Sequence, residues 1–288
     1  MILVDDARWP AHGTTFAHLV SDSSLEELHD FAGALGLDPR AFDHDHYDLP
    51  ACLVDAAVAH GAEQLRPTEL VRRLVASGLR VRAPDRTPSR ADATRRARRW
   101  WSERHPDEPA LADALLRRWA EPHRHYHDVR HLASTLHALE ALGCDDVAVG
   151  LAAWFHDAVH EGSPTDEDAS ATLASTLLAD TSLAAHRVEV ARLVRLTATH
   201  APRPDDRAGQ CLCDADLSVL GTVPGRYHVY LRDVRLEYAH LDDATFTHGR
   251  RSVVERLLAR PQLFATPPGQ RLWADRARRN LAAELIGC

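Results

Sequence analysis

In the central part of the chain, polar side chains interrupt stretches that are otherwise apolar. The segment LAAWFHDAVH carries the adjacent pair His156 and Asp157, and the segment ADLSVL follows with Asp216. An ionised carboxylate in an apolar stretch is costly unless it is paired or bound to a metal. His127 and His131 lie four residues apart, so they share one face of a helix. We therefore expect a site of imidazoles and carboxylates carried on separate helices.

Such a set of nitrogen and oxygen ligands suits Mn, Fe, Co, Ni, Zn or Mg. A divalent cation held in this way lowers the pKa of a bound water. A nucleophilic Ser or Cys is not needed for this chemistry.

The apolar residues after about position 95 recur with a helical period, and no strand pattern accompanies them. Before that, MILVDD is a strand candidate, and SDSSLEELHDFAGALGL opens with serines followed by Glu, a typical helix start. We predict a mainly α protein, in which a small α/β domain (residues 1–82) and a proline-containing linker (83–94) precede an all-α domain (95–288). The helices that we expect there are 109–120, 128–142, 145–160, 166–180, 184–200, 225–240, 243–260 and 268–286.

Composition excludes several classes of function. The net charge is −8, which argues against nucleic acid as a partner through a basic surface. All 34 basic residues are Arg, so Schiff-base chemistry and a Walker-type phosphate loop, which need Lys, are excluded. No apolar stretch is long enough to cross a membrane, and the start MILVDDARWP lacks a secretory pattern. With five scattered cysteines, these features lead us to expect a cytoplasmic protein.

The order His, His-Asp, Asp on helices resembles the HD superfamily of metal-dependent phosphohydrolases. The segments RHYHDVRHL, AAWFHDAVH, DEDASA and DADLSVLG are especially similar to its bacterial branch of predicted phosphohydrolases, over about residues 95–288. The resemblance implies an all-α fold, one or two divalent metal ions, and hydrolysis of a small phosphorylated substrate such as a nucleotide. A homo-oligomer is an open option.

When the ligand positions of the family are carried over to this sequence, the resemblance implies that the metal ligands are His131, His156, Asp157 and Asp216. Asp214 is the competing choice for the last ligand. His127 then contacts the substrate or a second metal, and it counts with Asp157 among the catalytic candidates. The branch often has an aromatic residue where His160 stands, so a contact from His160 is left open.

Three further residues are candidates, and two of them, Glu167 and His200, have a second interpretation. Glu167 is a catalytic candidate that binds a second metal or its water, or else a first-turn acid that stabilises its helix. Arg124 is a candidate for holding a phosphate, because a guanidinium matches phosphate oxygens. His200 is a substrate-binding candidate in the pocket, or else a cation favoured at a helix end.

The N-terminal segments VDDARWPAHGTTFAHLVSD, DHYDLP and ELVRRL resemble a family of bacterial domains of unknown function, over about residues 1–82. This resemblance implies no activity. Its acids, histidines and a tyrosine form either a second polar site or a structural core with a surface loop. These residues are Asp5, Asp6, His12, His18, His46, Tyr47 and Asp48.

Two other functions stay open at this point. The chain is alternatively a non-catalytic nucleotide-sensing or regulatory module, with the N-terminal domain as its output. In a third interpretation the N-terminal domain processes RNA or nucleotides, and the Arg-rich segment 86–104 guides the anionic partner.

Overall fold

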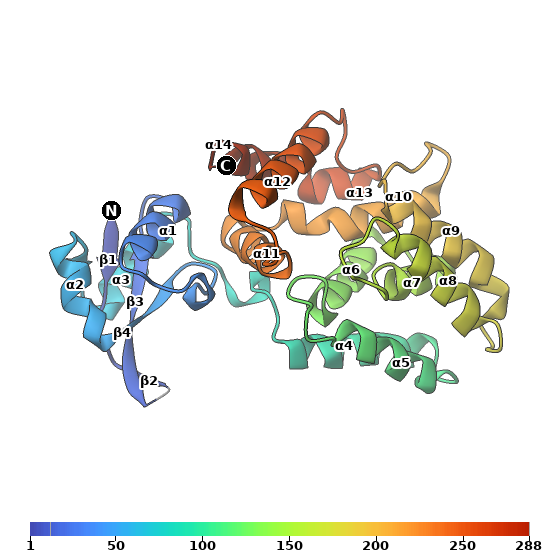
Figure 1. Ribbon diagram of the computed structural model, residues 1–288, viewed down its shortest axis with the longest axis horizontal. Coiled ribbons are helices and arrows are strands. Elements are labelled where there is room, and N and C mark those ends of the chain that lie inside the picture. The colour runs from blue at the N-terminus through green and yellow to red at the C-terminus, as the bar shows by residue number, and fades with distance from the viewer. Residues whose placement is uncertain (12, 288) are drawn as a thin grey trace. The chain divides into compact units, whose positions relative to one another are not determined.

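The computed structural model describes residues 1–11 and 13–287 and divides into two compact units (Figure 1). Leaving aside the last two residues, the first unit consists of Met1–Arg86 and Val223–Arg232, and we call it the sheet unit. The second consists of Thr87–Thr222 and Asp233–Ile286, and we call it the helical unit. A small α/β region followed by a helical part confirms the predicted fold class. The sequence did not predict that residues 223–232 group with the N-terminal unit.

The sheet is organised around one long strand. Its strands are β1 (Ile2–Val4), β2 (Trp9–Ala11), β3 (Thr14–Ser21), β4 (Tyr47–Pro50) and β5 (Glu63–Gln64). Strand β3 pairs antiparallel with β1, β2 and β4, and β1 pairs parallel with β5. The sequence pattern predicted only the first of these strands, because the others are short or mix polar with apolar residues.

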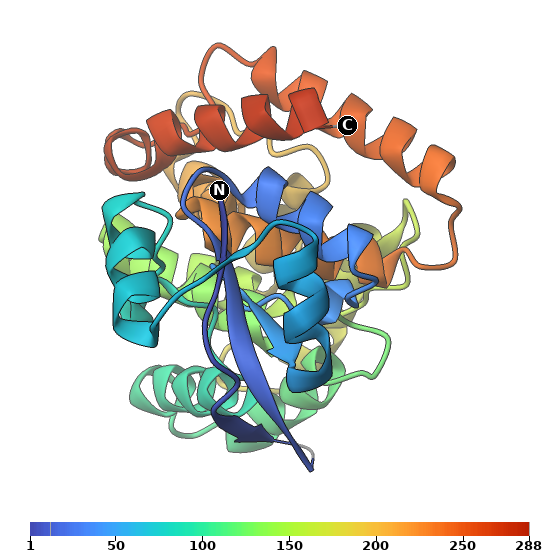
Figure 2. The same cartoon turned by 90° about the vertical axis from the view of Figure 1, so that its left-hand side faces the viewer.

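Helices cover both faces of this sheet, as Figure 2 shows. Side chains alternate between the two faces of a strand. Leu3 and Val20 therefore point to the face that α3 (Pro67–Ala76) covers, where they pack on Leu70 and Leu74. Residues of the opposite parity pack with α1 (Leu25–Ala34) and α2 (Val54–Ala59) on the other face. They are Ile2, Val4, Ala17 and Leu19.

Helix α1 begins where the sequence predicts. The Ser24 side chain accepts a hydrogen bond from the backbone N–H of Glu27 at 3.1 Å, and Glu27 stands in the first turn. This contact satisfies one of the backbone donors that a helix start leaves without a partner.

The helical unit is built from helices throughout its described residues. They are α4 (Arg90–Arg104), α5 (Pro109–Trp119), α6 (Val129–Leu142), α7 (Val147–Phe155), α8 (Asp166–Leu178), α9 (Arg187–Thr197), α10 (Arg207–Asp216), α12 (Asp243–Leu258), α13 (Pro267–Gly269) and α14 (Asp275–Gly287), while α11 (Pro224–Glu237) has residues in both units. Helix α4 begins inside the segment predicted as a linker, and α10 is an element that the sequence pattern did not predict. No helix in the described part of the chain has the length and apolar character that crossing a membrane requires.

Helix α7 lies at the centre of the helical unit. Every residue from Ala148 to Phe155 is buried, which explains why its sequence is apolar on all sides. It packs against α6 and α10 (Figure 1). Because His131 lies in the first turn of α6 and Asp216 ends α10, the packing brings helix termini together beside the end of α7.

Candidate metal centre

Four side chains that the sequence singles out as ligands converge in the helical unit. The Nε2 atoms of His131 and His156 lie 3.0 Å apart. Asp157 Oδ2 lies 3.2 Å from His156 Nε2 and 3.6 Å from His131 Nε2. Asp216 Oδ1 lies 3.0 Å from His131 Nε2 and 3.5 Å from His156 Nε2. His131, His156 and Asp157 therefore bring one ligand atom each within 4.8 Å of the others, and Asp216 contacts both imidazoles.

Neighbouring groups hold these ligands in position. His156 Nδ1–H donates to the Ala153 carbonyl at 2.9 Å, which leaves Nε2 as the ligand atom. His200 Nε2 lies 2.7 Å from Asp216 Oδ2, so the two oxygens of Asp216 have different partners. The buried Trp119 ring lies 5.5 Å from the His156 ring and 6.2 Å from the His131 ring, and keeps water from that side.

The charges of the cluster are strongly coupled. Burial opposes charge on both imidazoles, and it lowers the pKa of His131. For His156 the Asp157 and Asp216 carboxylates outweigh burial and raise the pKa well above its ordinary value. Burial raises the pKa of the Asp157 and Asp216 carboxyl groups, but the charge of His156 outweighs burial and lowers both pKa values. Two facing imidazoles next to two carboxylates form a place suited to a cation.

The sequence pattern indicated that the His-Asp pair lies inside a helix, but the structure places the pair just beyond a helix end. Helix α7 ends at Phe155, and His156 caps its C-terminus. Asp216 likewise ends α10. The C-terminus of a helix carries partial negative charge and favours cations. Two such termini beside the ligand atoms add to the attraction that the carboxylates exert on a metal ion.

A second group of ligand atoms lies beside the first. His127, His160 and Glu237 bring one ligand atom each within 4.8 Å of the others. The His127 ring lies 4.2 Å from the His160 ring and 5.6 Å from the His131 ring, measured between ring centres. His127 Nδ1 lies 2.7 Å from Glu237 Oε2. The contact from His160 that the sequence left open is therefore made to Glu237, at 3.7 Å.

Glu237 is a member of this group that the sequence did not single out. Its Oε1 accepts hydrogen bonds from the backbone N–H groups of His125, Tyr126 and His127, each at 2.8 Å. Although burial opposes ionisation, the bonds from His127 and His160 hold the pKa of Glu237 far below its usual range. Burial lowers the pKa of His127, but Glu237 outweighs it and raises that pKa. No local pattern marks Glu237, because its partners lie far earlier in the chain, 112 positions earlier for His125.

Asp214 faces a different part of the unit from Asp216. Its carboxylate is buried and accepts from the backbone N–H groups of Ala265 and Thr266 and from the Thr266 hydroxyl, each at 2.7 Å. Residues two apart on a helix point in different directions. The geometry therefore favours Asp216 over Asp214 as the residue beside the imidazoles.

Arg124, which the sequence offered as a candidate for holding a phosphate, has a structural role in the fold. Its side chain is fully buried, and its guanidinium donates to the carbonyls of His127 at 3.0 Å, Asp157 at 2.7 Å and Ala158 at 3.3 Å. It also donates to Glu121 Oε2 at 3.0 Å. Arg124 thus ties together the loops that carry His127 and the His-Asp pair, and its donors are used in doing so.

Glu167 and His200 take different positions. Glu167 lies in the first turn of α8, and it belongs to none of the ligand-atom groups found among the described residues. His200 contacts Asp216 and has a backbone φ of 47°, in the left-handed region. Of the two, only His200 touches a member of the cluster.

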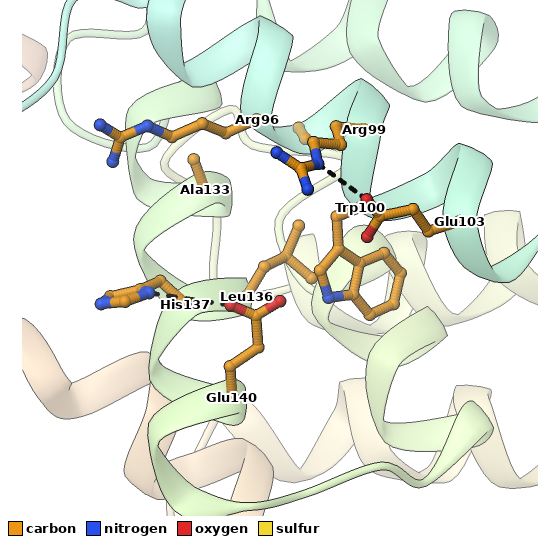
Figure 3. Close-up of a pocket in the computed structure, with 9 residues that line it drawn as sticks. Arg96, Arg99, Trp100, Glu103, Ala133, Leu136, His137 and Glu140 are labelled. Carbon is orange, nitrogen blue, oxygen red and sulfur yellow. Dashed lines mark hydrogen bonds and ion pairs between the residues drawn. The ribbon is translucent and has the colours of Figure 1, made fainter.

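A surface hollow of about 260 Å³ lies between α4 and α6 (Figure 3). Within it Arg99 pairs with Glu103 at 2.7 Å, and His137 lies 3.8 Å from Glu140. It includes none of the predicted site residues. The hollow is lined by Arg96, Ala97, Arg99, Trp100, Glu103, Ala133, Leu136, His137 and Glu140.

In the sheet unit, the structure brings together part of the polar set that the sequence singled out. His18, His46 and Asp48 bring one ligand atom each within 4.8 Å of the others. Tyr47 lies on the other face, where its hydroxyl bonds to His29, and Asp6 pairs with Arg8. His12 lies outside the described residues.

Comparison with known proteins bears on the N-terminal part of the chain. No match was found among curated proteins or solved structures. Residues 2–77 match a family described as "Protein of unknown function (DUF4031)". This match confirms the predicted resemblance to a domain of unknown function, and it assigns no activity to that domain.

Proposed function

We propose that the helical unit is a metal-dependent hydrolase of phosphate esters, acting on a small nucleotide or a related compound. The observation that carries this proposal is the convergence of four side chains on one pair of imidazoles: the Nε2 atoms of His131 and His156 lie 3.0 Å apart, and one oxygen each of Asp157 and Asp216 lies 3.0–3.6 Å from both of them. Ligands about 2.0–2.2 Å from a metal ion lie roughly 3–3.5 Å from one another. The donor set therefore fits a divalent ion with nitrogen and oxygen ligands.

These four residues would hold the ion, and each is prepared for that role. The imidazoles present Nε2, and the carboxylates stay ionised because burial is outweighed by the positive imidazole. When bound, a divalent ion would lower the pKa of water and withdraw charge from a phosphoryl oxygen. Asp157 has the additional role of accepting a proton from the attacking water.

His127 is our candidate for the group that contacts the phosphate. Glu237 occupies its Nδ1 and raises its pKa, so the imidazolium presents an Nε2–H donor. Such a donor stabilises negative charge on a phosphoryl oxygen or transfers a proton to the leaving oxygen. The group of His127, His160 and Glu237 is alternatively the place for a second metal ion, which would take Nε2 of His127 instead.

Metal analysis and turnover measurements test the proposal together. The purified protein would be supplied in turn with Mn²⁺, Fe²⁺, Co²⁺, Ni²⁺, Zn²⁺ and Mg²⁺ and assayed against a panel of nucleotides and phosphate esters. We expect Asp157→Asn and His156→Ala to lose one metal equivalent and the turnover. Asp145→Asn, on an exposed residue of the same unit, is the matched control.

Two results would contradict this function. Full metal content and full turnover in both site variants would remove the cluster from the reaction. Tight nucleotide binding without turnover at any of the metals would favour the nucleotide-sensing module.

A further inference from the structure

Three side chains with metal-binding atoms share one face of the sheet unit. His18 on β3 pairs directly with Asp48 on β4. His46 lies two residues before Asp48, so it points to the same face. This is the face on which α3 packs farther along, and it is the face opposite to Ala17, Tyr47 and Leu49. Strand pairing thus brings together residues from two separate segments.

A buried carboxylate orients each of the two histidines. Asp5 Oδ2 lies 2.9 Å from His18 Nδ1, and Asp5 Oδ1 accepts the backbone N–H of His18 at 2.6 Å. Asp45 Oδ1 lies 2.8 Å from His46 Nδ1. A carboxylate that accepts from Nδ1–H leaves Nε2 with its lone pair, as the outer partners of metal-binding histidines do.

Pairing with these acids alone does not explain the arrangement. Asp45 is already compensated by the backbone N–H of Val81 at 2.7 Å and by two arginines, Arg80 at 3.3 Å and Arg86 at 3.4 Å. One ring nitrogen of each imidazole and one Asp48 oxygen lie within 4.8 Å of one another. His46 Nε2 lies 3.5 Å from Asp48 Oδ1, and the ring centres of His18 and His46 are 5.0 Å apart.

The cluster is open to solvent on one side. The side chain of Asp48 is 53% exposed and that of His18 is 27% exposed, whereas Asp5 and Asp45 are buried. The exposed ring of Trp9 lies 5.4 Å from the His18 ring and borders the opening. Two imidazoles and one carboxylate with a free side are typical of sites where a metal keeps positions for water or substrate.

We propose that His18, His46 and Asp48 form a second site for a divalent transition metal ion, open to exogenous ligands, in the domain of unknown function. Asp5 and Asp45 are its positioning residues. Imidazole ligands suit Zn, Fe, Ni or Cu, and a ligand set of two histidines and one carboxylate is used with Zn and with non-haem Fe. This site does not depend on the function proposed for the helical unit.

Zinc stoichiometry in the full-length protein tests the proposal. The protein would be loaded with Zn²⁺, passed over a weak chelator and analysed for zinc per chain. We expect His18→Ala and His46→Ala each to hold one zinc fewer than the wild type, whatever the helical unit binds. His60→Ala is the control, because His60 is exposed in the same unit and belongs to no ligand group among the described residues.

Asp48→Asn keeps the test decisive if a histidine variant fails to fold, because Asp48 is exposed and the amide has the same shape. We expect its zinc affinity to fall roughly tenfold or more in competition with a chromogenic chelator, since a charged oxygen ligand becomes neutral. Unchanged zinc content and affinity in Asp48→Asn, or equal zinc in the wild type and a folded His46→Ala, would overturn the proposal. A zinc loss confined to His156→Ala would support the helical site alone.

Discussion

His131 Nε2 and His156 Nε2 face each other at 3.0 Å, although one residue begins α6 and the other follows α7. Two imidazoles in this position cannot both be protonated without strong repulsion. Asp157 and Asp216 lie beside the pair, at 3.2 Å from His156 Nε2 and 3.0 Å from His131 Nε2.

The first prediction concerns the two histidines of α6 and its preceding loop. His131→Ala should lose bound metal, because its Nε2 belongs to the converging set. His127→Ala should keep that metal while turnover falls by roughly 10²–10⁴-fold, the usual contribution of a positioned proton donor. Metal analysis and turnover of both variants check this. Metal loss only in His127→Ala would reverse the assignment.

Substitutions of Asp214 and Asp216 should have different effects: the first should lower the unfolding free energy, and the second should remove bound metal. Asp214→Ala leaves the backbone N–H groups of Ala265 and Thr266 without an acceptor, at ~1–3 kcal/mol for each. Asp216→Asn should keep its unfolding free energy close to that of the wild type but lose metal. Urea unfolding and metal analysis measure both effects. The reverse pattern would make Asp214 the ligand.

Arg124 should behave as a structural residue. Replacing a buried, bonded charge typically costs about 3–5 kcal/mol, so we expect Arg124→Met to lower the unfolding free energy by this order. Arg96→Met, on an exposed arginine of the same unit, should change it by no more than about 0.5 kcal/mol. A stable Arg124→Met protein with only a raised KM would restore the phosphate-binding role.

Gly150 and Gly249 should respond in opposite directions to alanine. A Cβ on Gly150 would lie 2.6 Å from the Trp100 ring, so overpacking should cost about 1–3 kcal/mol. A Cβ on Gly249 in α12 meets nothing within 4 Å, and the better helix former should add roughly 0.5–1 kcal/mol. Thermal unfolding of the two variants compares them. Equal shifts would contradict the packing of α7 on α4.

The stability of the sheet unit should fall in mild acid through His29. Burial, with a smaller contribution from His228, lowers the pKa of His29 to about 4, against a weak opposing effect of Glu26. Its Nδ1 lies 2.7 Å from the Tyr47 hydroxyl and its Nε2 lies 3.0 Å from His228 Nδ1. These contacts suit the neutral ring.

Between pH 6.5 and 4 the unfolded chain therefore binds a proton that folded His29 does not. The stability that His29 contributes is complete above pH 6.5 and is lost as the pH falls, by up to about 3 kcal/mol. His29→Gln, which does not titrate, should show a flatter pH dependence in urea unfolding. A stability difference from the wild type that stays constant from pH 7 to pH 4.5 would rule this out.

The sequence by itself predicted the helical class of the C-terminal part and singled out His131, His156, Asp157 and Asp216, which the structure brings together. Helical periodicity is local, and an aspartate in an apolar stretch is conspicuous because burying its charge is costly. The start of α1 could also be predicted, because the hydrogen bond between the Ser24 side chain and the Glu27 backbone joins residues only three positions apart.

Only the tertiary structure decided which groups meet. Glu237 reaches three backbone N–H groups from a distant helix, and Arg124 turned out to be buried among carbonyls that come from two loops. The orientation of His18 by Asp5 follows from pairing between β1 and β3. Such contacts depend on how helices and strands pack, and local sequence does not encode the direction from which a distant partner arrives.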